Sequence, residues 1–337
     1  MDNPRKSVTL KDIAAEAGIS PTAVSKVLNS KGGISRETEE RVRAIAERMG
    51  YTSNFVAKSL RTNSTRTLGV VISDSTHAFF GSVIKGAEEE AAKRGYSIIL
   101  VNTNRSRETE KKAIRTLMQK RVDGLLLASS MLTQPQDAEY LDALGVPYVY
   151  LIRRSEKPDA PFVGNDNVLG AFNMVDYLLK TGSKRIHFLN MTKDSTSSAE
   201  RLKGYMRALE THGVPWDPAL VYNMRPDIES GYTMMRSLLD AGEAVTAVFC
   251  GCDTIAVGAM EALFEKGIAV PGEVRVCGYD DIEFAAYLRR PLTTVRQPKE
   301  VIGVKGVELL LSRVEEGADA LPPVVILKSE LVVRQST

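Results

Sequence analysis

Seven short apolar runs that alternate with amphipathic helical runs constrain the fold of this chain more than any other feature of its sequence. The apolar runs begin at Leu68 and read LGVVIS, YSIILVN, VDGLLLAS, VPYVYLI, RIHFLN, AVTAVFCG and VRVCGYD. Such runs, separated by helices such as GSVIKGAEEEAAKRG, predict parallel sheet covered on both faces, and their number favours two doubly wound lobes. Because ligands of such sheets bind beyond the carboxyl ends of the strands, two facing lobes would form a binding cleft.

The first 50 residues have a different pattern, which predicts three short helices. The first follows Thr9 in a capping-box arrangement and reads LKDIAAEAG, and the third follows Ser35 and reads RETEERVRAIAERMG. The second opens with Ser20 and Pro21, because serine accepts a first-turn amide and proline at the first helical position loses no hydrogen bond. Helix, tight turn, helix and supporting helix form the helix-turn-helix pattern.

The second of these helices has one apolar face and one short polar face. Its apolar face, Val24, Val27 and Leu28, follows the spacing of a buried helix side. The opposite face carries small hydrogen-bonding groups and one cation, namely Thr22, Ser25, Lys26 and Asn29. In a helix-turn-helix protein this second helix enters the major groove of DNA, so the polar face is expected to meet bases and phosphates.

The charge of the chain is unevenly distributed. Residues 1–66 carry 12 Lys and Arg against 7 Asp and Glu, whereas the other residues carry 32 against 35. A basic head favours a polyanionic partner, although ordinary solvated charge also explains so small an excess. The sequence shows neither a signal-peptide pattern nor an apolar run of membrane-spanning length, so we expect a cytoplasmic protein without a membrane partner.

Cysteine and histidine give little support to catalysis or to metal binding. Cys250, Cys252 and Cys277 lie in apolar stretches without a four-ligand spacing, and the three histidines are far apart in the sequence. None of the common nucleophile, phosphate-binding or dinucleotide-binding motifs occurs. We therefore expect no catalytic residue, no metal site, no cofactor and no enzymatic activity.

A short segment between the two patterns is expected to need a partner. Asn54 can cap a helix of about two turns that ends at Leu60, with Val56, Ala57 and Leu60 on one apolar edge. Isolated helices shorter than ~12 residues are marginal in water. The polar RTNST that follows resembles a tether.

Motifs along nearly the whole chain resemble the lactose repressor and galactose repressor (LacI/GalR) family of bacterial transcription regulators. The stretches that carry the resemblance are VTLKDIAAEAGISPTAVSKVLN, GYTSNFVAKSLRTNSTRTLGVVI, QKRVDGLLL, DTIAVGAMEALFEKGIAVPGEVRVCGYDD, RRPLTTVRQP and VVRQST. The resemblance implies an all-α helix-turn-helix head at residues 1–52 and a hinge helix with linker at 53–66. It also implies an effector-binding α/β core at 67–337, built like periplasmic binding proteins.

The resemblance also sets the expected lobes and partners. Lobe one would comprise about 67–161 and 294–320, and lobe two about 162–293 and 321–337. The partners would be double-stranded DNA with a palindromic operator, a small-molecule effector, and a second copy of the chain in a homodimer or a dimer of dimers. Such a protein would be a repressor whose operator affinity an effector in the cleft controls.

By resemblance, specific residues of the head and hinge contact DNA. Base-reading positions correspond to Pro21, Thr22 and Lys26, and phosphate-contacting positions to Thr9, Ser20, Ser25 and Asn29. Capping or solvation explains Ser20 and Ser25 equally well when each is taken singly. In the hinge, the DNA-contacting residues would be Asn54, Ala57 and Leu60, with Leu60 wedged into the minor groove; the alternative is that Leu60 only packs against its neighbours.

Effector-binding positions of the family fall on a second group of residues. These are Phe79, Phe80, Arg201 and Asp280, with Asp166 and Asp253 near the cleft, a set suited to a polyhydroxylated ring. Arg153 is expected to bind the effector as well, at a place where this chain departs from the family. Asp280 could instead cap a turn, and Arg201 could be a surface charge. Ile152 stands where many relatives carry aspartate, and Arg153 and Arg154 follow it, which favours an anionic effector such as a sugar acid or sugar phosphate unless these arginines face solvent.

Two other classes of protein are the alternatives. A periplasmic sugar receptor would share the core, but it would need an export signal and would have no use for the polar helix after Ser20. An enzyme would need a nucleophile and a base, and the sequence offers no recognisable pair.

Overall fold

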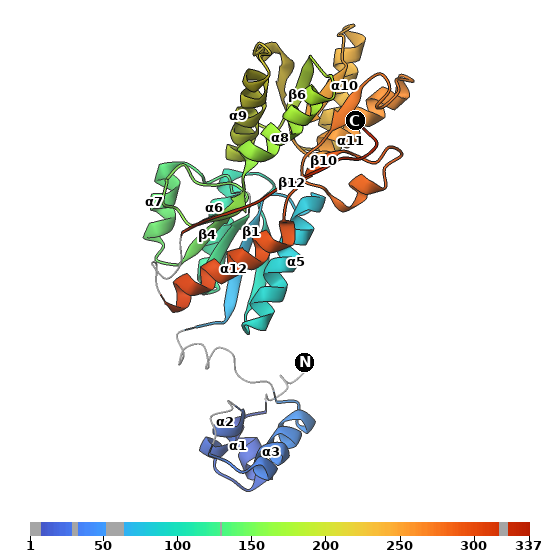
Figure 1. The fold of residues 1–337 in the computed structure, drawn as a ribbon. Coiled ribbons are helices and arrows are strands. Elements are labelled where there is room, and N and C mark those ends of the chain that lie inside the picture. The colour runs from blue at the N-terminus through green and yellow to red at the C-terminus, as the bar shows by residue number, and fades with distance from the viewer. Residues whose placement is uncertain (1–7, 29–32, 52–63, 129, 317–322) are drawn as a thin grey trace, which may run out of the picture. The chain divides into compact units, whose positions relative to one another are not determined.

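The computed structural model describes residues 8–28, 33–51, 64–128, 130–316 and 323–337. The chain divides into two compact units, Met1–Thr65 and Arg66–Thr337 (Figure 1). Each unit has its own hydrophobic core. The predicted hinge segment, including Asn54, Ala57 and Leu60, and the predicted phosphate contact Asn29 lie outside the described residues.

The described residues of the first unit form three helices at the predicted places: α1 (Leu10–Ala17), α2 (Pro21–Leu28) and α3 (Arg36–Arg48). α1 ends at Gly18, whose φ of 68° is a left-handed conformation that glycine adopts without strain. The Ser35 side chain caps α3 by accepting the amide of Thr38. The helices enclose a small core of buried residues, namely Ile13, Ala14, Ala17, Val24, Val27, Val42, Ile45 and Ala46.

The first lobe of the second unit is built on a six-stranded parallel sheet. In spatial order its strands are β11 (Val324–Leu327), β5 (Phe162–Asn165), β4 (Tyr148–Leu151), β3 (Gly124–Ala128), β1 (Thr67–Ile72) and β2 (Ser97–Asn102). Helices α5 (Ala78–Lys93) and α12 (Lys299–Glu315) cover one face (Figure 1). Helices α6 (Arg107–Gln119) and α7 (Pro135–Ala143) cover the other.

The second lobe is built on a four-stranded parallel sheet. In spatial order its strands are β7 (Val221–Asn223), β6 (Ile186–Asn190), β8 (Ala247–Cys250) and β9 (Arg275–Cys277). Helices α8 (Asn167–Lys180) and α9 (Thr196–Thr211) pack on one face, and α10 (Ile228–Asp240) and α11 (Asp253–Glu265) pack on the other. Two 3₁₀ turns, η1 (Pro218–Leu220) and η2 (Glu283–Ala286), complete this lobe.

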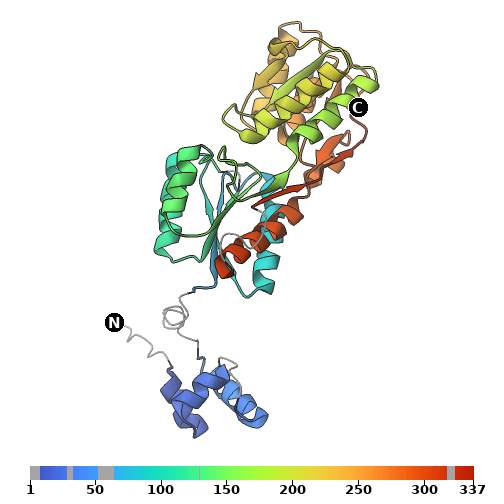
Figure 2. The same ribbon diagram turned by 60° about the vertical axis from the view of Figure 1, so that its left-hand side comes forward.

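A pair of short antiparallel strands accompanies the crossings between the lobes. β10 (Thr294–Arg296) pairs with β12 (Glu330–Val332). The chain leaves the first lobe after β5, returns with α12 and leaves again after β11 (Figure 2). The last residues then join the second lobe, because the amide of Val276 donates to the carbonyl of Ser336.

The helical head and the two doubly wound lobes confirm the predicted fold class. The lobe limits differ from the prediction. β5 and β11 pair with each other in the first sheet, so the first lobe extends to about residue 165 and includes residues 324–327. The prediction placed both segments in the second lobe because a single strand does not reveal which sheet supplies its hydrogen-bonding neighbour.

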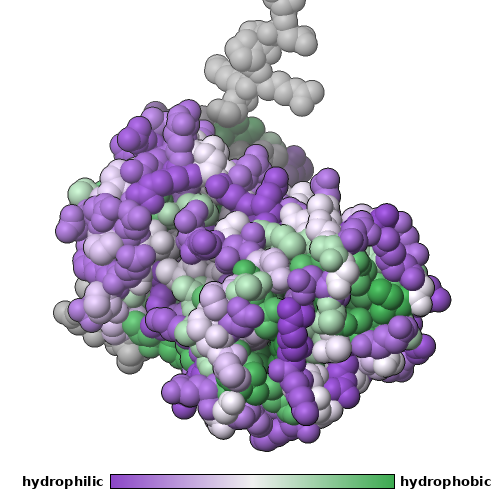
Figure 3. Space-filling model, turned by 90° about the horizontal axis from the view of Figure 1, so that it is seen from above, coloured by the Kyte–Doolittle hydropathy of each residue, from purple (hydrophilic) through white to green (hydrophobic). Residues whose placement is uncertain are grey.

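Strand β2 is an exception to the prediction that both faces of the strands are covered. β2 lies at the end of the first sheet, and Ile99 and Leu100 are 36% and 44% exposed. An edge strand has a neighbour on one side only, and here the helices reach only part of it. Elsewhere, the face drawn in Figure 3 is mainly hydrophilic, with separate hydrophobic patches.

The crossing of α5 and α12 depends on two glycines. A side chain at Gly86 would collide with the carbonyl of Glu300, and one at Gly303 would collide with the carbonyl of Val83. The two backbones therefore approach more closely than any larger residue allows.

Within the described ranges, no helix is both long enough and apolar enough to cross a lipid bilayer.

Candidate functional site

The outer face of α2 is open to a partner. Ser20, Pro21, Thr22 and Lys26 are exposed, and Ser25 is half-buried. The opposite face of the helix is fixed in the core by Val24 and Val27. The first turn of α2 is therefore rigidly held, with its polar side chains outward.

Two of the predicted DNA contacts already have partners within the head. The Ser20 hydroxyl accepts the amide of Ala23 at 3.2 Å, so it caps the helix. The amide and hydroxyl of Thr9 both donate to the Asp12 carboxylate, at 2.8 and 2.7 Å. Thr9 can therefore donate to a phosphate only by releasing Asp12.

The second unit contains a cavity between its two lobes. Residues that directly follow β-strands line it from both sheets, such as Ser73 after β1 and Met191 after β6. The full lining is Ser73, His77, Phe79, Phe80, Arg105, Ile152, Arg153, Met191, Ser195, Ser197, Arg201, Pro226, Cys252, Asp280 and Gln297. This is the carboxyl end of both sheets, where the doubly wound fold places ligands.

Three helices begin at the cavity. His77, Ser195 and Cys252 all line it, and they are the N-cap residues of α5, α9 and α11. The first-turn amides of a helix have no acceptor inside the helix, and its dipole makes this end partially positive. Three such ends give the cavity an affinity for acceptors and for negative charge.

Arg201 is held in place by contacts within the second lobe. It is 2% exposed, its Nε donates to Asn167 at 3.0 Å, and its Nη1 donates to the carbonyl of Gly251. Its guanidinium also lies over the ring of Tyr279, 3.7 Å from the centroid. These contacts fix its orientation before any ligand enters.

Asp280 faces Arg201 across a short gap. Its Oδ1 lies 3.9 Å from Nη2 of Arg201 and accepts a hydrogen bond from Gln297 at 2.6 Å. Burial raises the pKa of Asp280 to about 7, and the charge of Arg201 opposes this rise. Asp280 can therefore change its charge near neutral pH.

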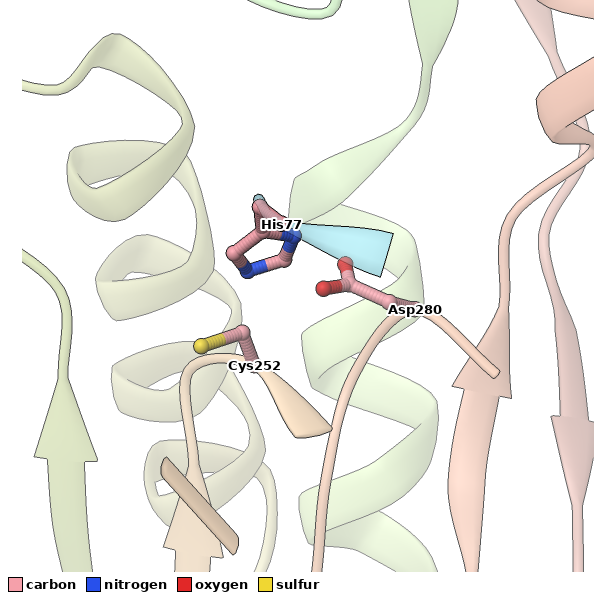
Figure 4. Close-up of side chains that lie close together, drawn as sticks. All are labelled: His77, Cys252 and Asp280. Carbon is pink, nitrogen blue, oxygen red and sulfur yellow. The ribbon is translucent and has the colours of Figure 1, made fainter. Parts of the chain in front are cut away.

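His77, Cys252 and Asp280 bring three possible ligand atoms within 4.8 Å of one another (Figure 4). The three residue types suit a transition metal. However, burial raises the pKa of Cys252 to about 12, which keeps its thiol protonated, and Arg201 lies beside Asp280. Burial also lowers the pKa of His77 to about 4, so its ring is neutral. These surroundings oppose a cation and favour a neutral or anionic guest.

Comparison with known proteins agrees with both the helix-turn-helix head and the two-lobed core with its cavity. Residues 9–54 match the family described as bacterial regulatory proteins, lacI family, and residues 65–330 match periplasmic binding proteins and sugar binding domain of LacI family. The chain belongs to the LacI family. It is accordingly a DNA-binding transcriptional regulator with a ligand-binding core.

Several LacI-family proteins resemble it along most of its length. An HTH-type transcriptional repressor PurR of Vibrio atlanticus is 36% identical over 91% of this chain and 92% of its own. The ribose operon repressor of Escherichia coli is 34% identical over 91% and 93%. A crystal structure of the Lac repressor dimer bound to operator and the anti-inducer ONPF has a TM-score of 0.89 and 28% identity, covering 98% and 99%.

Five of the predicted effector-binding residues of this LacI-family chain line the cavity: Phe79, Phe80, Arg153, Arg201 and Asp280. Two others do not, and for them the prediction is corrected. Asp166 caps α8 by accepting the amide of Leu169 at 2.8 Å. Asp253 is fully buried, and its carboxylate accepts from the hydroxyl of Thr294 and the amide of Ile282 at 2.6 and 2.9 Å. Both carboxylates stabilise the backbone.

Several residues of the cavity were not predicted from the sequence. These are Ser73, His77, Arg105, Met191, Ser195, Ser197, Cys252 and Gln297. Ser73, Arg105, Met191 and Cys252 closely follow strands of the two parallel sheets, so the rule that ligands bind at carboxyl ends could have selected these four. Gln297 instead follows β10, whose position beside the cavity depends on the crossing between the lobes.

Proposed function

We propose that this regulator binds a palindromic operator as a homodimer, and that a small sugar or sugar-derived molecule in the cavity changes its affinity for that operator. The regulator would act in the cytoplasm, where its DNA target lies, and without catalysing a reaction. The observation that carries the proposal is the cavity itself, because both lobes contribute to its lining.

Contacts across the cavity explain how a ligand would affect the lobes. Ser197 of the second lobe donates to the carbonyl of Ile152 in the first at 3.1 Å. Thr254 of the second lobe lies 3.4 Å from Nε2 of His77 in the first. A ligand that prefers one arrangement of these groups would shift the equilibrium between lobe arrangements by its difference in affinity.

The head supports the DNA-binding part of the proposal. The exposed first turn of α2 offers Thr22 and Lys26, with Pro21 available for apolar packing against a base. We propose that these residues read the operator, that Ser20, Ser25, Thr9 and Asn29 contact its phosphates, and that Asn54, Ala57 and Leu60 form the hinge contact. A twofold-symmetric dimer would read two inverted half-sites.

The homodimer is proposed by likeness to the Lac repressor, whose crystal structure is a dimer on its operator. The core of this chain has exposed apolar side chains that a second copy could cover. Among them are Leu100 on β2 and Tyr287 after η2, which are 44% and 83% exposed.

Selection of DNA fragments by the purified protein tests the proposal. Selected fragments should share an inverted repeat, and binding to them should weaken steeply with salt. A sugar that raises the melting temperature of the protein should also change its affinity for the selected fragment. Fragments without inverted symmetry, or a thermally stabilising sugar with no effect on DNA affinity, would contradict the proposal.

A further inference from the structure

Arg153 is a buried cation with an incomplete set of partners. It is 6% exposed and lines the cavity. Its guanidinium makes one polar contact with a described residue, from Nη1 to the sulfur of Met131 at 3.1 Å. A thioether is a weak acceptor, and a guanidinium carries five N–H donors. Burying a charge with so few partners is unfavourable, so the guanidinium would gain from a ligand that supplies hydrogen-bond acceptors and negative charge.

The other two arginines of the cavity have carboxylate partners. Arg105 lies 3.3 Å from Asp74, and Arg201 lies 3.9 Å from Asp280. Among the described residues, no such ion pair includes Arg153. The nearby Glu110 already accepts from the hydroxyl of Ser130 and the amide of Met131. When Asp280 is ionised, the cavity therefore has one cation in excess, and the charge of Arg105 adds to burial in lowering the pKa of Arg153 to about 10.

Gln297 supplies a second unfilled group. It is 2% exposed, and its Nε2 donates to the Asp280 carboxylate at 2.6 Å. Its Oε1 is buried and accepts no hydrogen bond from any residue that the structure describes. Buried acceptors in proteins are almost always paired, so we expect a ligand of this cavity to donate a hydrogen bond to this oxygen. A hydroxyl group fits, since Asp280 beside it can accept from a second hydroxyl.

We propose that the effector is a small polyhydroxylated monocarboxylate, a sugar acid, whose carboxylate binds Arg153 and whose hydroxyls bind Gln297 and Asp280. The proposal rests on the proposed function, because it names the ligand of the same cavity. The amide end of α9, at Ser195 and Ser197, lies on the same lining and adds donors for the carboxylate. Phe79 and Phe80 cover the apolar faces of the carbon chain.

The charge of the cavity favours a carboxylate over a phosphate. One unpaired cation is balanced by one negative charge, whereas a phosphate monoester carries nearly two at neutral pH. A second negative charge would have to compete with Asp74 or Asp280 for their arginines.

Replacement of Arg153 tests the unpaired charge without any ligand. Arg153→Met removes the charge and keeps an unbranched chain, so the melting temperature of the ligand-free full-length protein should rise. Arg201→Met, the matched control, should lower it, because Asn167, Gly251 and Tyr279 lose their partner. A lower melting temperature, or failure to fold, for both Arg153→Met and Arg153→Gln would overturn the proposal.

A matched panel of probes tests the ligand class. Five- and six-carbon aldonates and uronates are compared by calorimetry with their parent aldoses and with aldose phosphates. At least one sugar acid should bind, and its neutral parent should bind roughly thirtyfold or more weakly, as should the same acid with Arg153→Met. Arg154→Met should leave affinity unchanged, because Arg154 lies outside the cavity lining and over the ring of Phe162.

Operator binding is measured in the same samples, so that the two proposals can fail separately. One outcome is that a neutral sugar changes the affinity for operator while its acid binds no more tightly. That result would overturn the assignment of a ligand carboxylate to Arg153, but it would agree with the proposed function. Tighter binding of a phosphate than of every carboxylate, or no binding by any probe, would also overturn this assignment. A sugar acid that binds through Arg153 but leaves operator affinity unchanged would instead contradict the proposed function.

Discussion

The amide of Arg153 donates to the carbonyl of Leu151 at 2.8 Å, and the residue between them, Ile152, has a φ of 74°. A hydrogen bond from residue i+2 to residue i with positive φ at the centre is a γ-turn of the rare, strained form. Branched side chains are especially disfavoured there. The turn ends β4 abruptly and places Arg153 at the cavity, so strain is stored beside the group proposed to bind the effector.

The hydroxyl of Ser197 holds this turn from the other lobe, and its removal should be measurable. Ser197→Ala leaves the carbonyl of Ile152 without that donor in a buried position. We expect a loss of about 1–3 kcal/mol in the free energy of unfolding. Ser237→Ala, an exposed serine that bonds only within α10, should change it by less than about 0.5 kcal/mol in urea titration. Equal effects of the two substitutions would mean that Ser197 does not support the turn.

Affinity for a sugar acid should depend on pH through Asp280. Its pKa is about 7, so the side chain is mostly neutral at pH 6 and mostly anionic at pH 8. A bound carboxylate disfavours the anionic form, so affinity should fall as pH rises through 7, by up to about tenfold between pH 6 and pH 8. The ligand stays charged throughout this range, and His77, with a pKa of about 4, stays neutral. Burial also raises the pKa of Asp253 to about 6, and this carboxyl interacts with Asp280, so the two carboxyls together set the lower part of the profile.

Calorimetry at several pH values checks this dependence, with Asp280→Asn as the control. The substitution should flatten the profile while weakening binding of the hydroxyls. Affinity that rises between pH 6 and pH 8 in the unmodified protein would show that another group controls the titration.

Two substitutions in α2 should distinguish side chains that contact DNA bases from side chains that contact DNA phosphates. Lys26→Ala should relax sequence preference, at about 1–3 kcal/mol for a lost base contact, because Lys26 is exposed on the outer face. Ser25→Ala should weaken binding to all sequences evenly. Affinities for operator and for random DNA distinguish these results, and equal losses for Lys26→Ala on both DNAs would reassign Lys26 to a phosphate.

Substitutions at two glycines of α5 should change stability in opposite directions. Gly86→Ala places a methyl group against the carbonyl of Glu300 and should destabilise the core by about 1–3 kcal/mol. Gly81→Ala adds a methyl group in open space on the same helix and should stabilise it by about 0.5–1 kcal/mol. Denaturant unfolding measures both, and destabilisation of similar size at both positions would contradict the close approach of α5 and α12.

The sequence predicted best what depends on local chemistry. Ser35 and Gly18 fix helix ends through their own side chain or backbone, and both occur where expected. The seven predicted strands are all present. The membership of β5 and β11 in the first sheet was not predictable, because it depends on pairing between segments about 160 residues apart.

The residues of the candidate site also include some that local sequence predicts and some that it does not. Asp166 and Asp280 both follow strands, and no local feature distinguishes the aspartate that caps a helix from the one that faces the cavity. The unfilled acceptor of Gln297 was equally hidden, since it depends on where β10 crosses between the lobes. Arg153 was predicted from a departure from the family pattern, but only the three-dimensional structure shows that none of the described carboxylates forms an ion pair with it.

The central claim is that the cavity and the operator-binding head are coupled, and reciprocal linkage tests it most directly. A sugar acid identified in the panel is titrated into free protein and into the protein bound to its selected operator, at matched salt and pH. The account predicts two different affinities for the acid, with a ratio equal to the factor by which saturating acid changes the affinity for operator. Identical affinities for the acid in both states would contradict coupling and leave the core without a regulatory role.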